Sequence, residues 1–121
     1  MKILIVGAGR IGSSVAESLV SEANDITVVD QDAERIGSLQ SRFDLRGVVG
    51  NATSPQVLTD AGAADTDMLI AVTSSDETNL VVTMLCARIF NIPTRIARVR
   101  NNELRDYPRI CLLYTSPSPR D

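Results

Sequence analysis

The sequence has no histidine, no tryptophan and a single lysine, Lys2, among its 121 residues. Histidine is the most frequent general base and a common metal ligand in proteins, so its absence removes the usual acid–base group. The chain also has no Tyr-x-x-x-Lys pair, no Cys/His pair and no cluster with metal-ligand spacing. These absences argue against an enzyme and against a metal site. The sequence offers no candidate for a catalytic residue.

Cysteines are few, and long apolar runs are missing. Two cysteines, Cys86 and Cys111, do not suggest a disulfide framework and favour a reducing, cytoplasmic environment. No apolar run approaches the roughly 18–20 residues that span a bilayer, so direct membrane insertion is not expected. The apolar stretch after Met1 is also too short for a signal peptide.

The net charge is −3, so the chain lacks the excess of basic residues that a nucleic-acid binder needs. No nucleic-acid partner is expected. The charge is uneven, because residues 77–110 carry six arginines against three acids. These arginines could face a polyphosphate or a protein partner. The simpler alternative is that they are solvated or pair with acids of the first half of the chain.

A glycine-rich motif is the most informative feature present, and it comprises Gly7, Ala8, Gly9, Arg10, Ile11 and Gly12. It follows an apolar run at residues 3–6 and opens a segment with helical spacing. A second apolar run at residues 26–29 then ends in Asp30. This order of strand, glycine turn, helix, strand and acid is typical of a dinucleotide site, where the acid accepts hydrogen bonds from a ribose. The alternative, a glycine turn needed only for close packing, does not explain the acid.

Strand and helix patterns alternate along the rest of the chain. We expect strands at residues 2–6, 26–30, 47–49, 68–72 and 94–99, and helices at 10–21, from 32 to about 43, 54–62 and 74–90. Asp32 and Ser54 are predicted helix N-caps, and Ser74 with Glu77 has the spacing of a capping box. Strands that are apolar on both faces predict an α/β fold, a Rossmann-type parallel sheet with helices on both faces. The expected strand order is 3-2-1-4-5.

The sheet is expected to be truncated after its fifth strand, so that residues 1–110 form one nucleotide-binding domain. Residues 111–121 contain two prolines and show neither helical nor strand periodicity. We interpret them as a tail of foreign sequence, with a native disordered tail as the alternative.

The predicted fold brings several polar residues to the carboxyl ends of its strands, where the ligand crevice of such sheets lies. We expect Asn51 and Ala52 beside an adenine, and Thr73 and Ser74 beside a ribose or phosphate. Arg10 and Arg98 could pair with a phosphate, and Asn79 could face the crevice. Each has a simpler alternative: a turn for Asn51, a helix cap for Ser74, and surface exposure for Asn79.

The identity of the nucleotide is only partly fixed by the sequence. Asp30 and Asp32 place two carboxylates where the 2′-phosphate of NADP would lie, which disfavours NADP by repulsion. NAD+, NADH, ADP and ATP all remain. Asp32 also has the simpler role of capping the second helix.

Several stretches resemble one known family closely: residues 1–9, 24–30, 43–46, 67–79 and 95–100. Over about nine tenths of its length, the chain is similar to the N-terminal nucleotide-binding domains, called RCK or KTN domains, of the TrkA family. The stretches at 73–79 and 95–100 are more specific than the glycine loop. The residues that the resemblance assigns to nucleotide binding are those at 7–12, 30, 51–52, 73–74 and 98.

The resemblance implies a regulatory function. Proteins of this family are cytoplasmic, peripheral membrane subunits that bind NAD(H) and adenine nucleotides. They assemble into rings and control a Trk-type potassium-transporting membrane subunit. By resemblance, this chain is a homo-oligomer, a dimer or a higher ring, without catalytic activity. Two alternatives are an RCK domain of a potassium channel or efflux system, and the cofactor domain of a truncated NAD-dependent dehydrogenase.

Overall fold

The computed structural model describes residues 1–101 and 103, which form one α/β unit. The elements in chain order are β1 (Lys2–Val6), α1 (Arg10–Val20), β2 (Asp25–Asp30), α2 (Ala33–Arg42), β3 (Arg46–Val49), α3 (Pro55–Asp60), a short 3-10 helix η1 (Ala63–Asp65), β4 (Met68–Ala71), α4 (Asp76–Arg88) and β5 (Thr94–Ala97). The tail at residues 111–121 lies outside the described residues, so its interpretation stays a prediction.

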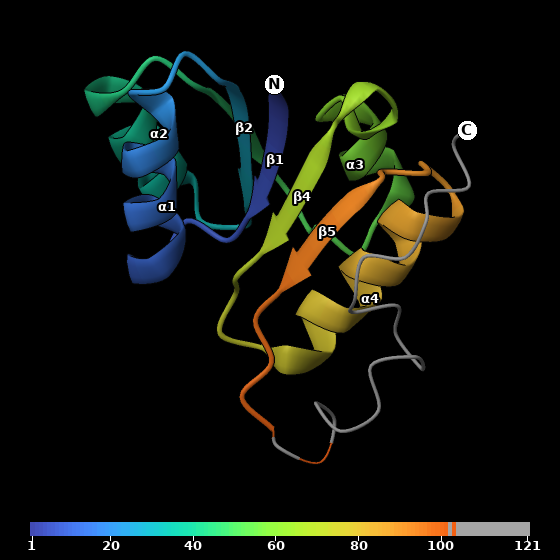
Figure 1. Cartoon of the computed structure of the whole chain (residues 1–121). Helices are drawn as coiled ribbons and strands as arrows, with labels where there is room; N and C mark the ends of the chain where they lie inside the picture. Colours follow the sequence, from blue (N-terminus) through green and yellow to red (C-terminus); the bar gives the residue numbers. More distant parts are fainter. Residues whose placement is uncertain (102, 104–121) are drawn as a thin grey trace.

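The five strands form one parallel sheet in the order β3-β2-β1-β4-β5, which confirms the predicted Rossmann-type topology (Figure 1). β1 pairs with β2 through Ile3 opposite Ile26, and with β4 through Ile3 opposite Met68. The order therefore reverses between β1 and β4, because successive crossovers lead away from β1 in opposite directions.

Helices cover both faces of the sheet because the central strands are apolar on both sides. Ile3 and Ile5 of β1 belong to a core formed with α1 and α2, and Leu4 and Val6 belong to a second core formed with α3 and α4. All four side chains are at most 2% exposed. Complete burial on both faces is the usual environment of a parallel strand.

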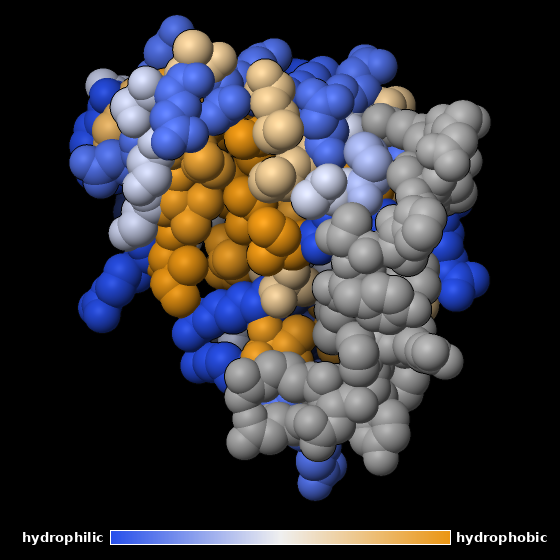
Figure 2. Space-filling model, viewed as in Figure 1, coloured by the Kyte–Doolittle hydropathy of each residue, from blue (hydrophilic) through white to orange (hydrophobic). Residues whose placement is uncertain are grey.

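The face that carries α1 and α2 is less completely covered at β5. Figure 2 shows apolar surface gathered on this side of the molecule. Ile96 of β5 pairs in register with Ile70 of β4, and parallel neighbours in register project to the same face. Ile96 is 49% exposed, whereas Ile70, one strand further in, is 7% exposed.

The helix boundaries follow local capping rules, with one correction to the prediction. Asp32 caps α2 by accepting hydrogen bonds from the N–H groups of Glu34 and Arg35, and Ser54 caps α3 just before Pro55. The prediction that Ser74 caps α4 is wrong. Ser75 is the cap, and its side chain accepts from the N–H of Thr78 at 3.1 Å. Both serines satisfy the residue preference for an N-cap, but only Ser74 has a glutamate at capping-box spacing, so the sequence pattern favoured the wrong serine.

Candidate functional site

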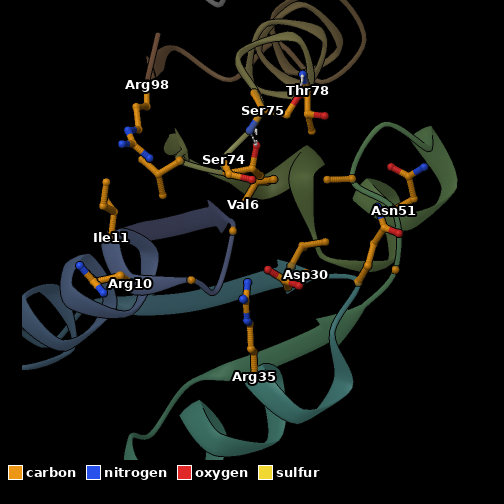
Figure 3. A pocket seen from close by; sticks show the side chains of 18 residues that line it. Val6, Arg10, Ile11, Asp30, Arg35, Asn51, Ser74, Ser75, Thr78 and Arg98 are labelled. Atoms are coloured by element: carbon orange, nitrogen blue, oxygen red, sulfur yellow. Dashed lines mark hydrogen bonds between the residues drawn. The ribbon is translucent and has the colours of Figure 1, made fainter. Parts of the chain in front are cut away.

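An open cleft of about 650 Å³ lies at the carboxyl ends of β1 and β4, where the strand order reverses. In open α/β sheets this is the general position of ligand sites. The lining residues come from every strand end of the sheet: Val6, Gly7, Gly9, Arg10, Ile11, Val29, Asp30, Gln31, Arg35, Gly50, Asn51, Ala52, Val72, Thr73, Ser74, Ser75, Thr78 and Arg98. Figure 3 shows Arg10, Ile11 and Arg98 toward one end of this cleft and Asn51 toward the other.

The three glycines of the motif have different structural roles. Gly7 has a φ of +113°, which residues with a side chain rarely adopt, so the turn out of β1 requires glycine. Gly12 packs so closely that an added Cβ would lie 1.8 Å from the carbonyl oxygen of Gly7. Gly9 has an ordinary φ of −76°, and an added Cβ would meet only the Arg35 guanidinium, at 3.6 Å. Gly9 therefore keeps the cleft open, whereas Gly7 and Gly12 shape the turn.

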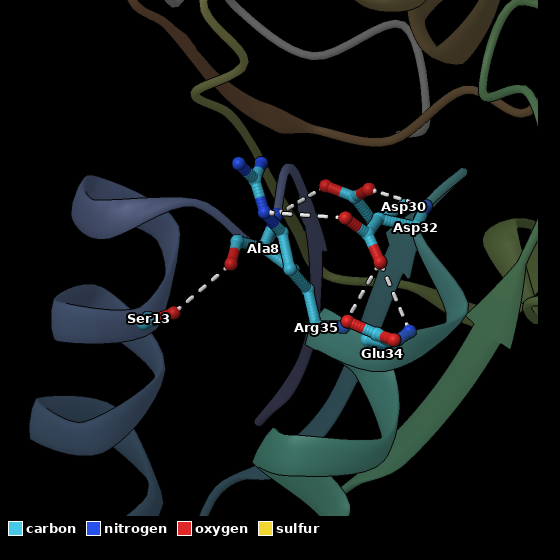
Figure 4. A network of polar contacts seen from close by, with 6 residues as sticks. All are labelled: Ala8, Ser13, Asp30, Asp32, Glu34 and Arg35. Carbon is cyan, nitrogen blue, oxygen red and sulfur yellow. Dashed lines mark hydrogen bonds and ion pairs between the residues drawn. The ribbon is translucent and has the colours of Figure 1, made fainter.

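The Asp30 carboxylate connects the glycine loop to the end of β2, as Figure 4 shows. One of its oxygens accepts from the N–H of Ala8 and the other from the N–H of Asp32, both at 2.7 Å. Asp30 is only partly buried, and it lines the cleft. A carboxylate oxygen has two lone pairs, so each oxygen can still accept a hydroxyl of a ligand.

Asp32 is used mainly by the protein itself. Its Oδ1 accepts from the N–H groups of Glu34 and Arg35 at 2.9 and 3.3 Å, and its Oδ2 lies 3.6 Å from the Nε of Arg35. Asp32 is not among the residues that line the cleft. Its predicted second role, as the helix cap, is confirmed.

Asn79 connects the ends of β4 and β5 beneath the cleft. Its Oδ1 accepts from the N–H and the hydroxyl of Thr73 at 2.9 and 2.7 Å, and its Nδ2 donates to the carbonyls of Thr73 and Arg98 at 3.1 and 2.8 Å. The side chain is fully buried. These contacts use both ends of the amide, so Asn79 is placed to position its neighbours rather than to face a ligand.

The segment after β5 is held against the start of α4. The carboxylate of Asp76 accepts from the N–H groups of Arg100 and Asn101 at 3.1 and 2.9 Å, and the guanidinium of Arg100 donates to the carbonyl of Ser74 at 2.8 Å. The hydrogen bond from the Arg100 N–H is the main reason that the pKa of Asp76 lies below its ordinary value. This clamp lies two residues beyond Arg98, and it fixes the direction in which the chain leaves β5.

Asn51 and Ala52 lie in the turn after β3. The Oδ1 of Asn51 accepts from the N–H and the hydroxyl of Thr53 at 3.0 and 2.8 Å, so this oxygen stabilises the turn. The side chain is exposed and lines the cleft. Ala52 is 6% exposed and adds apolar surface to the same wall.

Most of the residues predicted from the sequence meet in the cleft, and three do not line it: Ala8, Gly12 and Asn79. Ala8 contributes its N–H to Asp30, and Gly12 and Asn79 support the walls from behind. Sequence patterns did not single out Arg35, Ser75 or Thr78, which also line the cleft. Ser75 and Thr78 were missed because the cap of α4 was predicted one residue too early, at Ser74. Ser75 is the cap, and Thr78 is the residue whose N–H group donates to it. Arg35 carries no sequence signal beyond its position in the first turn of α2.

Two kinds of feature are absent from residues 1–101 and 103. No group of three or more metal-ligating side chains is found in that part of the chain. None of the helices there is long and apolar enough to cross a membrane.

Comparison with known proteins adds relatives over most of the chain. The chain is 55% identical over 103 residues to the Trk system potassium uptake protein TrkA of Haemophilus influenzae, and 52% identical over 103 residues to that of Vibrio alginolyticus. Both matches cover 85% of this chain but only 22% of the relative. The chain therefore spans about a fifth of the length of these curated relatives.

Two solved structures share the fold. The Kef C-terminal domain of Shewanella denitrificans in its AMP-bound form has a TM-score of 0.81 at 19% identity, covering 98% of this chain and 71% of that one. The GsuK channel bound to NAD has a TM-score of 0.76 at 21% identity, covering 91% of this chain and 20% of that one. The family model described as the TrkA-N domain matches residues 3–110. The chain thus belongs to the TrkA-N domain family.

Proposed function

We propose that the cleft binds NAD+ or NADH, with ADP and ATP as alternative ligands. The observation that carries this proposal is the convergence of Gly7, Gly9, Asp30 and Arg98 on one cleft at the reversal of strand order. A glycine loop before a helix N-terminus accommodates a diphosphate, and a carboxylate at the end of the second strand binds a ribose diol. Among solved relatives of this fold, one is described as AMP-bound and another as bound to NAD.

The proposed ligand would lie along the cleft in a defined direction. The adenine would rest near Asn51 and Ala52, and its ribose would face Asp30. The diphosphate would lie over Gly9 at the start of α1, where the helix N–H groups and dipole favour negative charge. The far end of a dinucleotide would then reach Thr73, Ser74 and Arg98, which line the opposite part of the cleft.

We further propose that the domain is regulatory. The curated relatives are named as potassium uptake proteins, and the described residues offer no histidine, while Lys2 begins β1 at the end opposite the cleft. Binding of nucleotide would control a Trk-type potassium-transporting membrane subunit. The domain would then act at the cytoplasmic face of the membrane, as a peripheral and homo-oligomeric component.

Calorimetric titration with NADH, NAD+, ADP and NADPH tests ligand binding. We expect binding of NADH or NAD+ and weaker binding of NADPH, since the 2′-phosphate would approach Asp30. The matched negative control is Gly9→Val, which fills the cleft without a backbone conflict. Absence of binding by all four nucleotides to the folded wild-type chain would refute the proposal.

Mixing NADH with a panel of carbonyl substrates tests the regulatory role. We expect the absorbance of NADH at its characteristic wavelength to stay at the level of a protein-free sample. Oxidation of NADH that the Gly9→Val variant abolishes would instead identify a dehydrogenase cofactor domain.

Light scattering of the chain at high micromolar concentration tests the proposed homo-oligomer. An edge strand with an exposed Ile96 and a fourth helix with an exposed Val81 present apolar surface that self-association would cover. A mass equal to that of one chain under these conditions would contradict the homo-oligomer.

A further inference from the structure

Arg35 is an arginine of the cleft that lacks a firm partner within the protein. It belongs to the first turn of α2, its side chain is 58% exposed, and it lines the cleft together with Gly9 and Asp30. Figure 4 shows the side chain rising from α2 between the loop at Ala8 and the carboxylates of Asp30 and Asp32. Figure 3 shows the same side chain directed into the cleft.

The carboxylates around Arg35 are already engaged by backbone groups. Both oxygens of Asp30 accept backbone N–H groups, and Oδ1 of Asp32 accepts two more. The ion pair of the guanidinium is with Oδ2 of Asp32, which accepts no backbone N–H and lies 3.6 Å from Nε. This distance is beyond hydrogen-bonding range, and exposed ion pairs of this kind are weak. Arg35 can therefore exchange this partner at little cost.

The position of the guanidinium matches the place where a diphosphate would lie. Its Nη1 atom is 3.6 Å from the point that a Cβ on Gly9 would occupy. Gly9 is the residue of the loop whose missing side chain leaves the cleft open. A phosphate that fills this space would meet the guanidinium directly, and guanidinium groups bind phosphate through paired, charge-assisted hydrogen bonds.

We propose that Arg35 is a phosphate-binding residue of this cleft, held near Asp32 in the free protein and transferred to the diphosphate of the bound nucleotide. This inference rests on the proposed nucleotide function and adds a residue from α2 to the site. The nucleotide would then be held from two sides, by the loop and α1 on one side and by α2 on the other.

The test is calorimetric titration with ADP and NADH of the wild-type chain and two variants. Arg35→Gln should lower the affinity for both ligands about tenfold, because a charge-assisted hydrogen bond to phosphate is lost. Arg42→Gln is the matched control, since it removes the same charge from the same helix. Arg42 lies over the ring of Phe43 at 5.1 Å and does not line the cleft. It should leave the affinity within about twofold of wild type, as expected for a distant, screened charge.

A third variant tests the exchange of partners. Asp32→Asn keeps the oxygen that caps α2, since asparagine is as good a cap as aspartate, but it removes the charge beside Arg35. It should raise the affinity for ADP. An unchanged or lower affinity would refute the pairing of Arg35 with Asp32 as the state that precedes binding.

The outcomes separate this inference from the proposed function. If wild type binds ADP and NADH but Arg35→Gln binds them equally well, the inference is wrong and the proposed function stands. If both arginine variants lose affinity to the same extent, the loss reflects the removal of a positive charge from α2 in general, and the inference is again wrong. If wild type binds none of these ligands, the proposed function itself fails.

Discussion

At the scale of single residues, the glycine loop separates the requirement for folding from the requirement for binding. Gly7 and Gly12 are needed for the shape of the turn, because one has a positive φ and the other touches the backbone of the first. Gly9, the N-cap of α1, is needed mainly for open space in the cleft. The sequence motif does not distinguish the three glycines. The structure predicts that substitution of Gly7 or Gly12 affects folding stability and that substitution of Gly9 affects nucleotide binding.

Substitution of Gly9 and Gly12 should therefore have opposite consequences. Gly12→Ala places a methyl group against the Gly7 carbonyl, so the free energy of unfolding should fall by about 3 kcal/mol. Gly9→Val should change stability by about 1 kcal/mol, mainly through the weaker helix cap, while nucleotide binding is lost. Thermal unfolding together with calorimetry measures both quantities. Equal losses of stability in the two variants would contradict this assignment.

Asp30→Ala tests the carboxylate that is proposed to bind the ribose. The variant removes the acceptor proposed for the ribose, so the affinity for NADH should fall by about 1.5–3 kcal/mol, roughly 10- to 150-fold in Kd. The preference for NADH over NADPH should also decrease, since the repulsion of a 2′-phosphate is gone. Asp44→Ala, which removes an exposed acid outside the cleft, is the charge-matched control. Unchanged affinity of Asp30→Ala for NADH would remove Asp30 from the site.

At the scale of elements, the strands were largely predictable and the polar residues of helices were not. Residues 3–6 and 68–71 are apolar on both faces, and in a chain where such short runs alternate with helices this pattern indicates buried parallel strands. The cap of α2 was equally clear, because Asp32 precedes a helix whose apolar residues Ile36 and Leu39 fix its register.

The remaining errors have a common physical cause. The roles of Asn79 and Arg35 depend on what lies opposite them across the fold, and this is information that local spacing does not contain. Asn79 was expected either to face the crevice or to be exposed at the surface, but it is buried and bonded to residues 6 and 19 positions away along the chain. Arg35 was not predicted at all, because an arginine in the first turn of an exposed helix is an ordinary solvent-facing residue.

The contact between α4 and the segment after β5 should depend on pH. The pKa of Asp76 is lowered in the folded chain from its ordinary value of 3.8, so the clamp is fully formed above that value and is lost as the pH falls through the folded pKa. The amide NMR signals of Arg100 and Asn101 should therefore titrate as the pH falls, with a midpoint below 3.8. In Asp76→Asn they should not titrate in this range. A midpoint above 3.8 for wild type would contradict the clamp.

At the scale of the whole molecule, the reactivity of a single thiol reports both ligand binding and global stability. Cys86 of α4 is fully buried in the core, and burial raises its pKa to about 12, with the charge of Arg95 opposing this shift. A neutral, inaccessible thiol reacts only when the fold opens. Its labelling rate therefore measures the population of opened molecules.

In a Cys111→Ser background, NADH at a hundredfold excess over its Kd should slow the labelling of Cys86 about a hundredfold. A ligand that binds only the folded state adds about 2.7 kcal/mol of stability at this excess. The Gly9→Val variant should show no such protection. Rapid labelling of the folded wild-type protein, or protection that persists in Gly9→Val, would contradict the prediction.

The hydrogen bonds of Asn79 make one rigid body of the far wall of the cleft. A single buried amide holds the backbone of Thr73 after β4 and the carbonyl of Arg98 after β5, and it stands on the second turn of α4. While these bonds are intact, the two strand ends cannot move independently of each other or of the helix. We therefore expect a ligand that shifts the backbone of Arg98 to shift the end of β4 and the start of α4 with it.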